Sequence, residues 1–122
     1  MTLLDSNIII YAAKPEHSKL RQFIRENAPF VSAVSYVEVL GYSRFSDDER
    51  RHFEAFFASA TILPISDAVL DEAVRLRQAK KMPLGDALTA GTALVHGLTL
   101  VTRNTKDFDW ISGLSLLDPF QA

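Results

Sequence analysis

The length of 122 residues is that of one domain, which we expect to span residues 1–122. Apolar residues make up 48% of the chain and charged residues 23%, which excludes a disordered or fibrous polypeptide. The net charge of −2 is spread evenly, because residues 1–60 carry seven basic and eight acidic side chains and residues 61–122 carry six and seven. A nucleic-acid partner would therefore have to be held by a local basic patch.

The chain contains no cysteine, which excludes disulfides, thiol catalysis and cysteine-bound metals. Its first residues lack the basic region of a signal peptide, and Asp5 interrupts their apolar run. No stretch approaches the roughly 18 apolar residues of a membrane span. We expect a cytoplasmic protein that does not contact a membrane.

Short apolar segments alternate with amphipathic segments along the chain. In chain order, the expected elements are a strand at Thr2–Leu4, a short helix at 8–13, a helix opened by residues 15–17, a strand at 29–33, a helix starting at Ser35, a helix at 46–59, a strand at 61–65, a helix at 67–81, a helix at Leu84–His96, and strands at 98–102 and 115–117. Strands that alternate with helices need crossover connections, so we expect the α/β class with a parallel sheet in three layers.

Three acidic residues stand alone in segments that otherwise lack charge. Asp5 is the only charged side chain in residues 1–13, Glu38 the only one in 27–43 and Asp86 the only one in 82–102. Burying an unpaired carboxylate costs several kcal/mol, and these segments offer no basic partner. Three such acids in one small chain suggest that they lie together.

The expected topology brings these acids to one edge of the sheet. Asp5 ends the first strand, and we place Glu38 and Asp86 in the first turns of helices at the same edge. Clustered carboxylates repel one another, so they bind either protons or a hard divalent cation such as Mg²⁺ or Mn²⁺.

Each acid also has a purely structural interpretation. Asp5 fits an Asx turn that caps the following helix, and Asp86 favours a helix dipole. Ser35 and Glu38 match the S-x-x-E capping box. A capping carboxylate can still offer an oxygen to a metal, so the two interpretations are compatible.

Four segments in this order resemble the PIN-domain ribonucleases, and most closely the small VapC-type toxins of toxin–antitoxin pairs. They are Leu-Leu-Asp-Ser-Asn at 3–7, Ser-Tyr-Val-Glu-Val-Leu-Gly at 35–41, Leu-Gly-Asp-Ala at 84–87, and Leu-Val-Thr-Arg-Asn at 100–104 with Asp-Phe at 107–108. No single segment is specific, but together they cover essentially the whole chain. The resemblance implies an α/β/α fold in three layers around a central parallel sheet of about five strands.

The resemblance also implies hydrolysis of RNA that depends on Mg²⁺, with Mn²⁺ as the alternative ion, and leaves 5′-phosphate and 3′-hydroxyl ends. Asp5, Glu38 and Asp86 fall on the acidic positions of the family, and Asn104 falls on a fourth position that is usually Asp. We expect Asp5 and Asp86 to be direct metal ligands, with Glu38 completing the shell or acting on the attacking water. An amide is a poorer cation ligand than a carboxylate, and Asp107 is a candidate replacement.

The resemblance further implies an RNA substrate (transfer or ribosomal RNA), a cognate antitoxin protein and a homodimer. Candidate contacts to RNA phosphates and water are Lys14, Arg44, Arg103, Lys106, Ser6 and Thr102. Phe53, Phe56 and Phe57 form a helical stripe that serves the core or, in part, an antitoxin segment. His17, His52 and His96 lack ligand spacing and are expected at the surface.

Two other enzyme classes fit less well, and one non-enzymatic alternative stays open. A receiver module needs an acidic pair beside its Asp and a Lys after a late strand, where this chain has Arg103 and Asn104. A phosphatase with an Asp-x-Asp nucleophile is excluded by Asn7. A catalytically inactive PIN-like scaffold that binds protein or RNA is the remaining alternative, because Asn104 departs from the acidic pattern.

Overall fold

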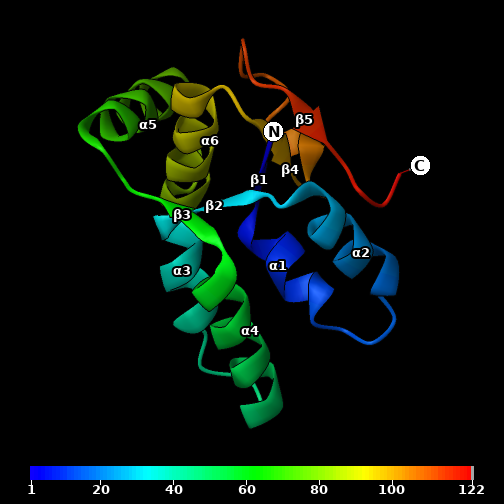
Figure 1. The fold of residues 1–122 in the computed structure, drawn as a ribbon. Helices are drawn as coiled ribbons and strands as arrows, with labels where there is room; N and C mark the ends of the chain where they lie inside the picture. The colour runs from blue at the N-terminus through cyan, green and yellow to red at the C-terminus, as the bar shows by residue number, and fades with distance from the viewer. Residues whose placement is uncertain (122) are drawn as a thin grey trace.

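Five short parallel strands form the centre of the protein, whose computed structural model describes residues 1–121 (Figure 1). The strands follow the order β3-β2-β1-β4-β5 across the sheet. Their bounds are Thr2–Leu4 (β1), Phe30–Ser32 (β2), Thr61–Leu63 (β3), Thr99–Val101 (β4) and Leu116–Leu117 (β5). The helices are Ser6–Ala12 (α1), Ser18–Asn27 (α2), Ala33–Leu40 (α3), Asp47–Ser59 (α4), Asp67–Ala79 (α5) and Leu84–His96 (α6), with a short 3₁₀ turn η1 at Thr105–Asp107.

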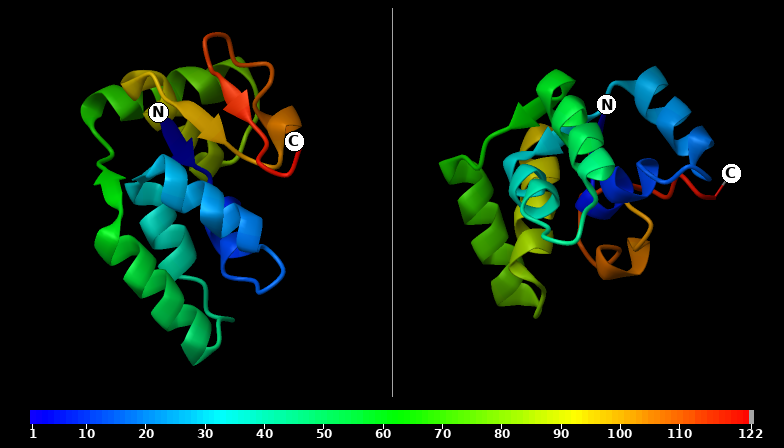
Figure 2. Two further views of the ribbon diagram at one scale, coloured as in Figure 1. Left: turned by 45° about the vertical axis from the view of Figure 1, so that its right-hand side comes forward. Right: turned by 90° about the horizontal axis from the view of Figure 1, so that it is seen from below.

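The central strand β1 sends alternate side chains into two separate cores. Leu3 pairs with Leu100 of β4, and both are fully buried against α5 and α6. Leu4 pairs with Val101, and both are buried against α1, α2, α3 and α4. Because successive strand residues face opposite sides, the sheet carries helices on both faces. Figures 1 and 2 show α5 and α6 on one side of the sheet and α1 to α4 on the other, which confirms the three-layer α/β/α fold.

The prediction that a helix starts at Ser35 is wrong. The helix α3 begins at Ala33, and the Ser32 hydroxyl accepts a hydrogen bond of 3.1 Å from the Val34 amide as its N-cap. The strand β2 runs into α3 without a loop, so the last strand residue is itself the cap. Glu38 consequently lies in the second turn of α3, and Ser35 and Glu38 form no capping box.

The other boundaries differ from the predictions by a few residues. The helix α1 starts at Ser6, directly after β1, whereas α2 starts only at Ser18. The helix α5 ends at Ala79, β1 has the predicted bounds, and the other four strands are shorter than expected. The helix α4 begins as predicted, with a capping box between Ser46 and Glu49. No helix within residues 1–121 combines the length and apolarity that crossing a bilayer requires.

Candidate active site

Asp5 lies where β1 ends, tied by two hydrogen bonds to the neighbouring strand β4. Its amide donates to the Val101 carbonyl over 2.9 Å, and its Oδ2 accepts from the Thr102 hydroxyl over 2.9 Å. Asp5 occupies the N-cap position of α1, but its side chain makes no capping hydrogen bond to the helix. Burial raises the pKa of Asp5 above its usual range, against the lowering effect of the Thr102 hydrogen bond.

Glu38 reaches this edge of the sheet from α3 through two serine hydroxyls. Ser6 Oγ donates to Glu38 Oε1 over 2.7 Å, and Ser6 Oγ lies 2.9 Å from Ser35 Oγ. A hydroxyl has one proton to give, so Ser35 donates to Ser6, which donates to Glu38. Sequence reasoning missed Ser35 as a site residue. The available signal was a small polar residue one helical turn before Glu38 in an apolar helix.

The third acid, Asp86, lies in the first turn of α6 as predicted. The pKa of Asp86 is raised to about 6, first by desolvation and then by the negative charges of Asp5, Asp107 and Glu38, in that order. The Glu38 carboxylate also lies against the backbone of Gly85, where a side chain at Gly85 would collide with Glu38 Oε2. Glu38 therefore lies beside Ser6, the residue after Asp5, and against Gly85, the residue before Asp86.

Two further polar residues follow β4 at the same edge. The backbone N–H of Asn104 donates to the Thr102 hydroxyl over 3.1 Å, so Thr102 bridges the backbone of residue 104 and the Asp5 carboxylate. Asp107, at the end of η1, adds negative charge near both Asp5 and Asp86. Asp107 also lines one hollow with Asp86, and its role as a replacement for the usual fourth acid stays a prediction.

The carboxylates do not form a closed metal cage. Within residues 1–121, no group of three or more His, Cys, Asp or Glu side chains is arranged to hold an ion. Mg²⁺ usually keeps several waters and binds through one or two carboxylates. The donor set of Asp5 and Asp86 fits such a hydrated ion, because both carboxylates are partly desolvated and crowded by like charge.

The expected phosphate contacts are only partly available. The Arg103 guanidinium lies 4.5 Å from the ring centroid of Phe120 and 5.5 Å from that of Tyr11, so it stacks on aromatic rings. Lys106 lines a hollow that also contains Asp86. Lys14 and Arg44 are exposed.

The histidines partly follow the prediction. His52 and His96 are exposed. His17 is half-buried, with its ring centroid 6.1 Å from that of Tyr11 and 5.2 Å from that of Phe120.

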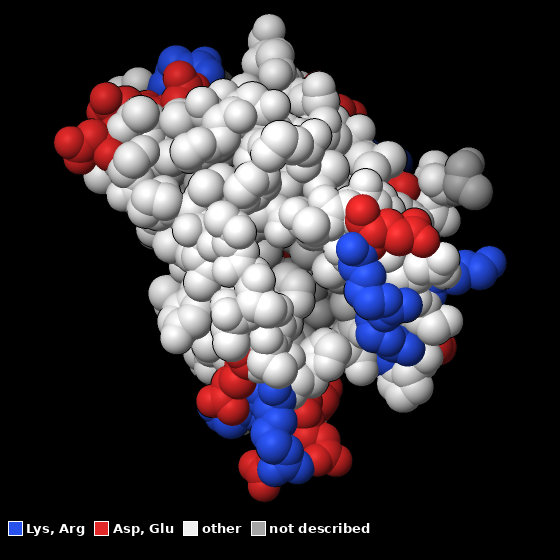
Figure 3. Space-filling model, viewed as in Figure 1, with Lys and Arg blue, Asp and Glu red and all other residues white. Residues whose placement is uncertain are grey.

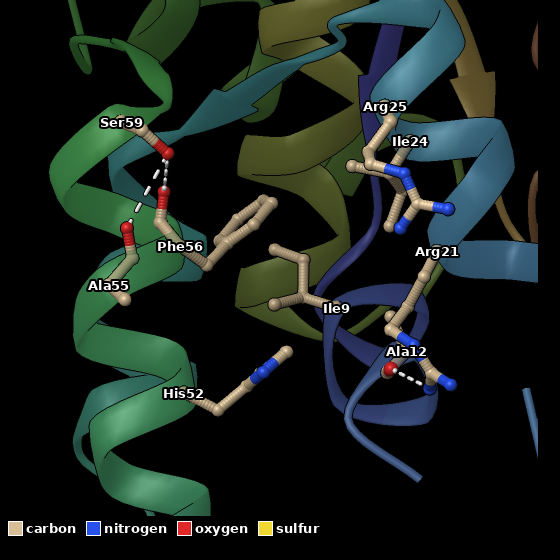
Figure 4. A pocket seen from close by; sticks show the side chains of 9 residues that line it. All are labelled: Ile9, Ala12, Arg21, Ile24, Arg25, His52, Ala55, Phe56 and Ser59. Atoms are coloured by element: carbon tan, nitrogen blue, oxygen red, sulfur yellow. Dashed lines mark hydrogen bonds between the residues drawn. The ribbon is translucent and has the colours of Figure 1, made fainter. Parts of the chain in front are cut away.

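A second concave feature lies between α2 and α4, away from the acids (Figures 3 and 4). It has a volume of about 300 Å³. Its lining residues are Ile9, Ala12, Arg21, Ile24, Arg25, His52, Ala55, Phe56 and Ser59. Of the predicted phenylalanine stripe, Phe53 and Phe57 are buried in the core, and only Phe56 reaches this groove.

Comparison with known proteins assigns a family to this fold and site. The family model of the PIN domain matches residues 2–114. This chain belongs to the PIN domain family, which confirms the resemblance drawn from the sequence.

Individual relatives are similar over nearly their whole length. The ribonuclease VapC1 of Rickettsia felis is 29% identical, with 94% of this chain and 93% of the relative covered. The tRNA(fMet)-specific endonuclease VapC of Shigella flexneri is 26% identical, with 95% and 96% covered. A solved toxin–antitoxin complex from Klebsiella pneumoniae contains a chain that is 28% identical, with both chains covered to 100% and a TM-score of 0.79. These names support a nuclease.

Proposed function

We propose that this protein is an endoribonuclease that depends on Mg²⁺, with Mn²⁺ as the alternative ion, and that it is the toxin of a toxin–antitoxin pair. The observation that carries the proposal is the meeting of Asp5, Glu38 and Asp86 at the carboxyl edge of a parallel sheet, where burial, together with the neighbouring negative charges, raises the pKa of Asp86 to about 6. The names of the VapC relatives support RNA as the substrate.

Asp5 and Asp86 are the residues that would hold the ion. A bound cation of this kind lowers the pKa of the attacking water and neutralises the scissile phosphate. Thr102 fixes the orientation of the Asp5 carboxylate through its hydrogen bond of 2.9 Å. Burial of Asp5, which is 8% exposed, keeps competing water away from that carboxylate.

Glu38 is the residue placed to take a proton from the attacking water. Its Oε1 is held by Ser6, while Oε2 lies over Gly85, the residue before Asp86. The water oxygen forms a bond to phosphorus as the bond from phosphorus to the 3′ oxygen breaks. Hydrolysis in this direction leaves a 5′-phosphate and a 3′-hydroxyl. The backbone N–H of Asn104 donates one hydrogen bond to Thr102 at the same edge, and the Asn104 side chain adds no charge there.

Two kinds of protein partner belong to this proposal. A cognate antitoxin would occupy the groove between α2 and α4, where Phe56 offers an apolar contact and Arg21 and Arg25 lie on the opposite wall (Figure 4). A second copy of the chain would cover the broad uncharged surface in Figure 3. That surface lies over elements with exposed apolar side chains, namely Tyr36, Val37, Ile62, Leu70, Val74 and Leu84.

Cleavage of cellular RNA by the purified protein tests the enzyme against the inactive scaffold. Transfer and ribosomal RNA incubated with the protein in Mg²⁺ or Mn²⁺ should give discrete fragments that carry 5′-phosphates, and EDTA should abolish them. An inactive scaffold would bind RNA or antitoxin without cutting. Intact RNA after incubation with either ion would contradict the proposal.

A further inference from the structure

A small hollow beside Asp86 collects an unusual share of the basic side chains. Its volume is about 220 Å³, and it lies between the end of α5, the start of α6 and the η1 turn. Three of the five lysines in the chain line it. The polar and aromatic side chains of its lining are Lys80, Lys81, Lys106, Trp110, Asp86 and Asp107.

The aromatic wall of this hollow is held in place. Trp110 Nε1 donates to the Asp107 carbonyl over 3.1 Å, and the half-buried ring packs against the core beneath α5 and α6. The Lys80 ammonium lies 5.4 Å from the centroid of the ring, as in a cation–π contact. The Trp110 ring is therefore held in one position, and the flexible, exposed side chain of Lys80 that covers it can move aside.

The lysines of the hollow are not neutralised by ion pairs. Within residues 1–121 the ion pairs are Arg51 with Asp48 and Arg75 with Glu72, and neither involves a lysine. A chain with a net charge of −2 thus places three ammonium groups around one concavity, next to an acid of the candidate active site. Such a concavity meets the requirement for a local basic patch that the evenly spread charge imposes.

Single-stranded RNA fits this combination of groups. Proteins bind single strands by stacking bases on aromatic rings and by holding the backbone phosphates with basic side chains. The indole of Trp110 and the lysines supply both elements in a hollow that Asp86, an acid of the candidate active site, also lines.

We propose that this hollow binds the nucleotide next to the scissile phosphate, with its base stacked on Trp110 and its phosphates held by Lys80 and Lys106. The proposal rests on the proposed ribonuclease function and adds the path of the RNA strand, which leaves the acids over Asp86 towards η1. Lys81 also lines the hollow and adds to the electrostatic attraction.

The sole tryptophan of the chain makes the hollow directly observable, because all indole fluorescence comes from Trp110. A ten-nucleotide oligouridylate is titrated into the wild-type protein in EDTA, and into Asp5→Asn protein in Mg²⁺, conditions in which the proposed mechanism does not cut. Stacking of a base should quench the fluorescence along a saturating binding curve. The same oligonucleotide, labelled with fluorescein, gives the affinity by anisotropy.

Exposed lysines allow matched variants that keep the fold. Lys80→Gln and Lys106→Gln should each weaken binding several-fold and reduce the salt slope of the logarithm of affinity by about 0.7, as expected for one lost phosphate contact on a single strand. Lys19→Gln on α2 removes the same charge far from the hollow and should leave both quantities unchanged. Trp110→Ala should weaken binding about tenfold, and Trp110→Phe, which keeps a ring, should lose less.

The two proposals fail in different ways. Unquenched fluorescence, or Lys80→Gln and Lys106→Gln proteins that bind like the wild type, would overturn the subsite even if the wild type cleaves RNA. Quenching together with the reduced salt slopes would establish the subsite even if no RNA is cut, and in that case only the ribonuclease function would fail.

Discussion

The Ser6 hydroxyl donates a hydrogen bond of 2.7 Å to Glu38 Oε1, across 32 positions of the sequence. This bond joins the first residue of α1 to the second turn of α3 and holds an otherwise exposed carboxylate at the edge of the sheet. The other carboxylate oxygen, Oε2, lies in space left free by the missing side chain of Gly85. The position of Glu38 therefore depends on two neighbours that are themselves neither acidic nor metal-binding.

Gly85→Ala should damage activity without damaging the fold. The added methyl group would collide with Glu38 Oε2, and because this oxygen ends a flexible side chain, the carboxylate would move and lose its fixed place. Alanine also favours the helix α6 over glycine. We expect RNA cleavage to slow by about tenfold to 100-fold, as for a misplaced catalytic group, with an unchanged or higher melting temperature.

Ser6→Ala is the companion variant, since it removes the donor to Glu38 and should slow cleavage in the same direction. A Gly85→Ala protein that cleaves RNA at the wild-type rate would show that the position of Glu38 is unimportant.

The metal-free protein should be destabilised by Asp86 at neutral pH. The folded-state pKa of Asp86 is raised from 3.8 to about 6, so the folded protein binds this proton more tightly than the unfolded chain does. The proton on Asp86 stabilises the folded state fully below about pH 4, and this stabilisation is lost as the pH rises through about 6. In EDTA, Asp86→Asn should therefore melt above the wild type at pH 7.5 and lose this advantage at pH 4.5.

Mg²⁺ supplies the control for the Asp86 experiment. A ligand that binds only the folded state stabilises it by about 2.7 kcal/mol when its concentration is 100 times its Kd. The wild-type protein should therefore melt at a higher temperature in Mg²⁺ than in EDTA. The melting temperature of Asp86→Asn protein should rise much less. If Asp86 acts only on the helix dipole, Asp86→Asn would be destabilised at pH 7.5 and Mg²⁺ would leave both melting temperatures unchanged.

Asn104→Asp should strengthen metal binding at the edge formed by Thr102 and Asp5. The backbone of residue 104 is fixed by its hydrogen bond to Thr102, so a carboxylate there would add charge beside Asp5 and Asp107. We expect a higher affinity for Mn²⁺ or Mg²⁺, or a changed preference between them, in calorimetric titrations of both proteins. Identical isotherms would mean that position 104 is not a metal ligand.

Phe56→Glu should weaken the complex with the cognate antitoxin and spare the fold. Phe56 is half-buried and lines the groove between α2 and α4, whereas Phe57 is 4% exposed and belongs to the core. A charge at the buried Phe57 would disrupt the core and report on folding. A charge at Phe56 reports on antitoxin binding. Ala58→Glu places the same charge at an exposed position of α4 outside the groove lining.

Co-purification with the antitoxin measures the outcome. We expect the antitoxin to be lost from Phe56→Glu protein and retained by Ala58→Glu protein. A complex that survives Phe56→Glu intact would exclude this groove as the docking site.

The sequence predicts the place of the acids better than their local contacts. A helix that leads into a parallel strand starts at the carboxyl edge of the sheet, and this rule, applied to α6 before β4, is enough to bring Asp86 to the end of β1 at Asp5. The start of α3 was mispredicted because Ser32 and Ser35 both have the chemistry of an N-cap, and only the direct passage from β2 into the helix selects Ser32. Local pattern contains no information on that choice.

Contacts between distant segments cannot be predicted from the sequence pattern. The bond between Ser6 and Glu38 and the space at Gly85 depend on how α1, α3 and α6 pack, which periodicity does not specify. The hollow with Lys80 and Trp110 likewise joins the end of α5 to the residues after η1. Each of these side chains alone is typical of an ordinary solvated surface.

The rate of RNA cleavage by Asp5→Asn protein, compared with wild-type protein and Asp109→Asn protein in saturating Mg²⁺, tests the central claim most directly. Asp5 is buried at the meeting point of β1 and β4, whereas Asp109 is exposed, so the two variants remove the same charge from the site and from the surface. Loss of a cation ligand removes several kcal/mol of transition-state stabilisation, which corresponds to a fall of about 100-fold or more. The account predicts this fall for Asp5→Asn alone, with a melting temperature in EDTA at or above that of the wild type. Wild-type cleavage by Asp5→Asn protein would contradict it.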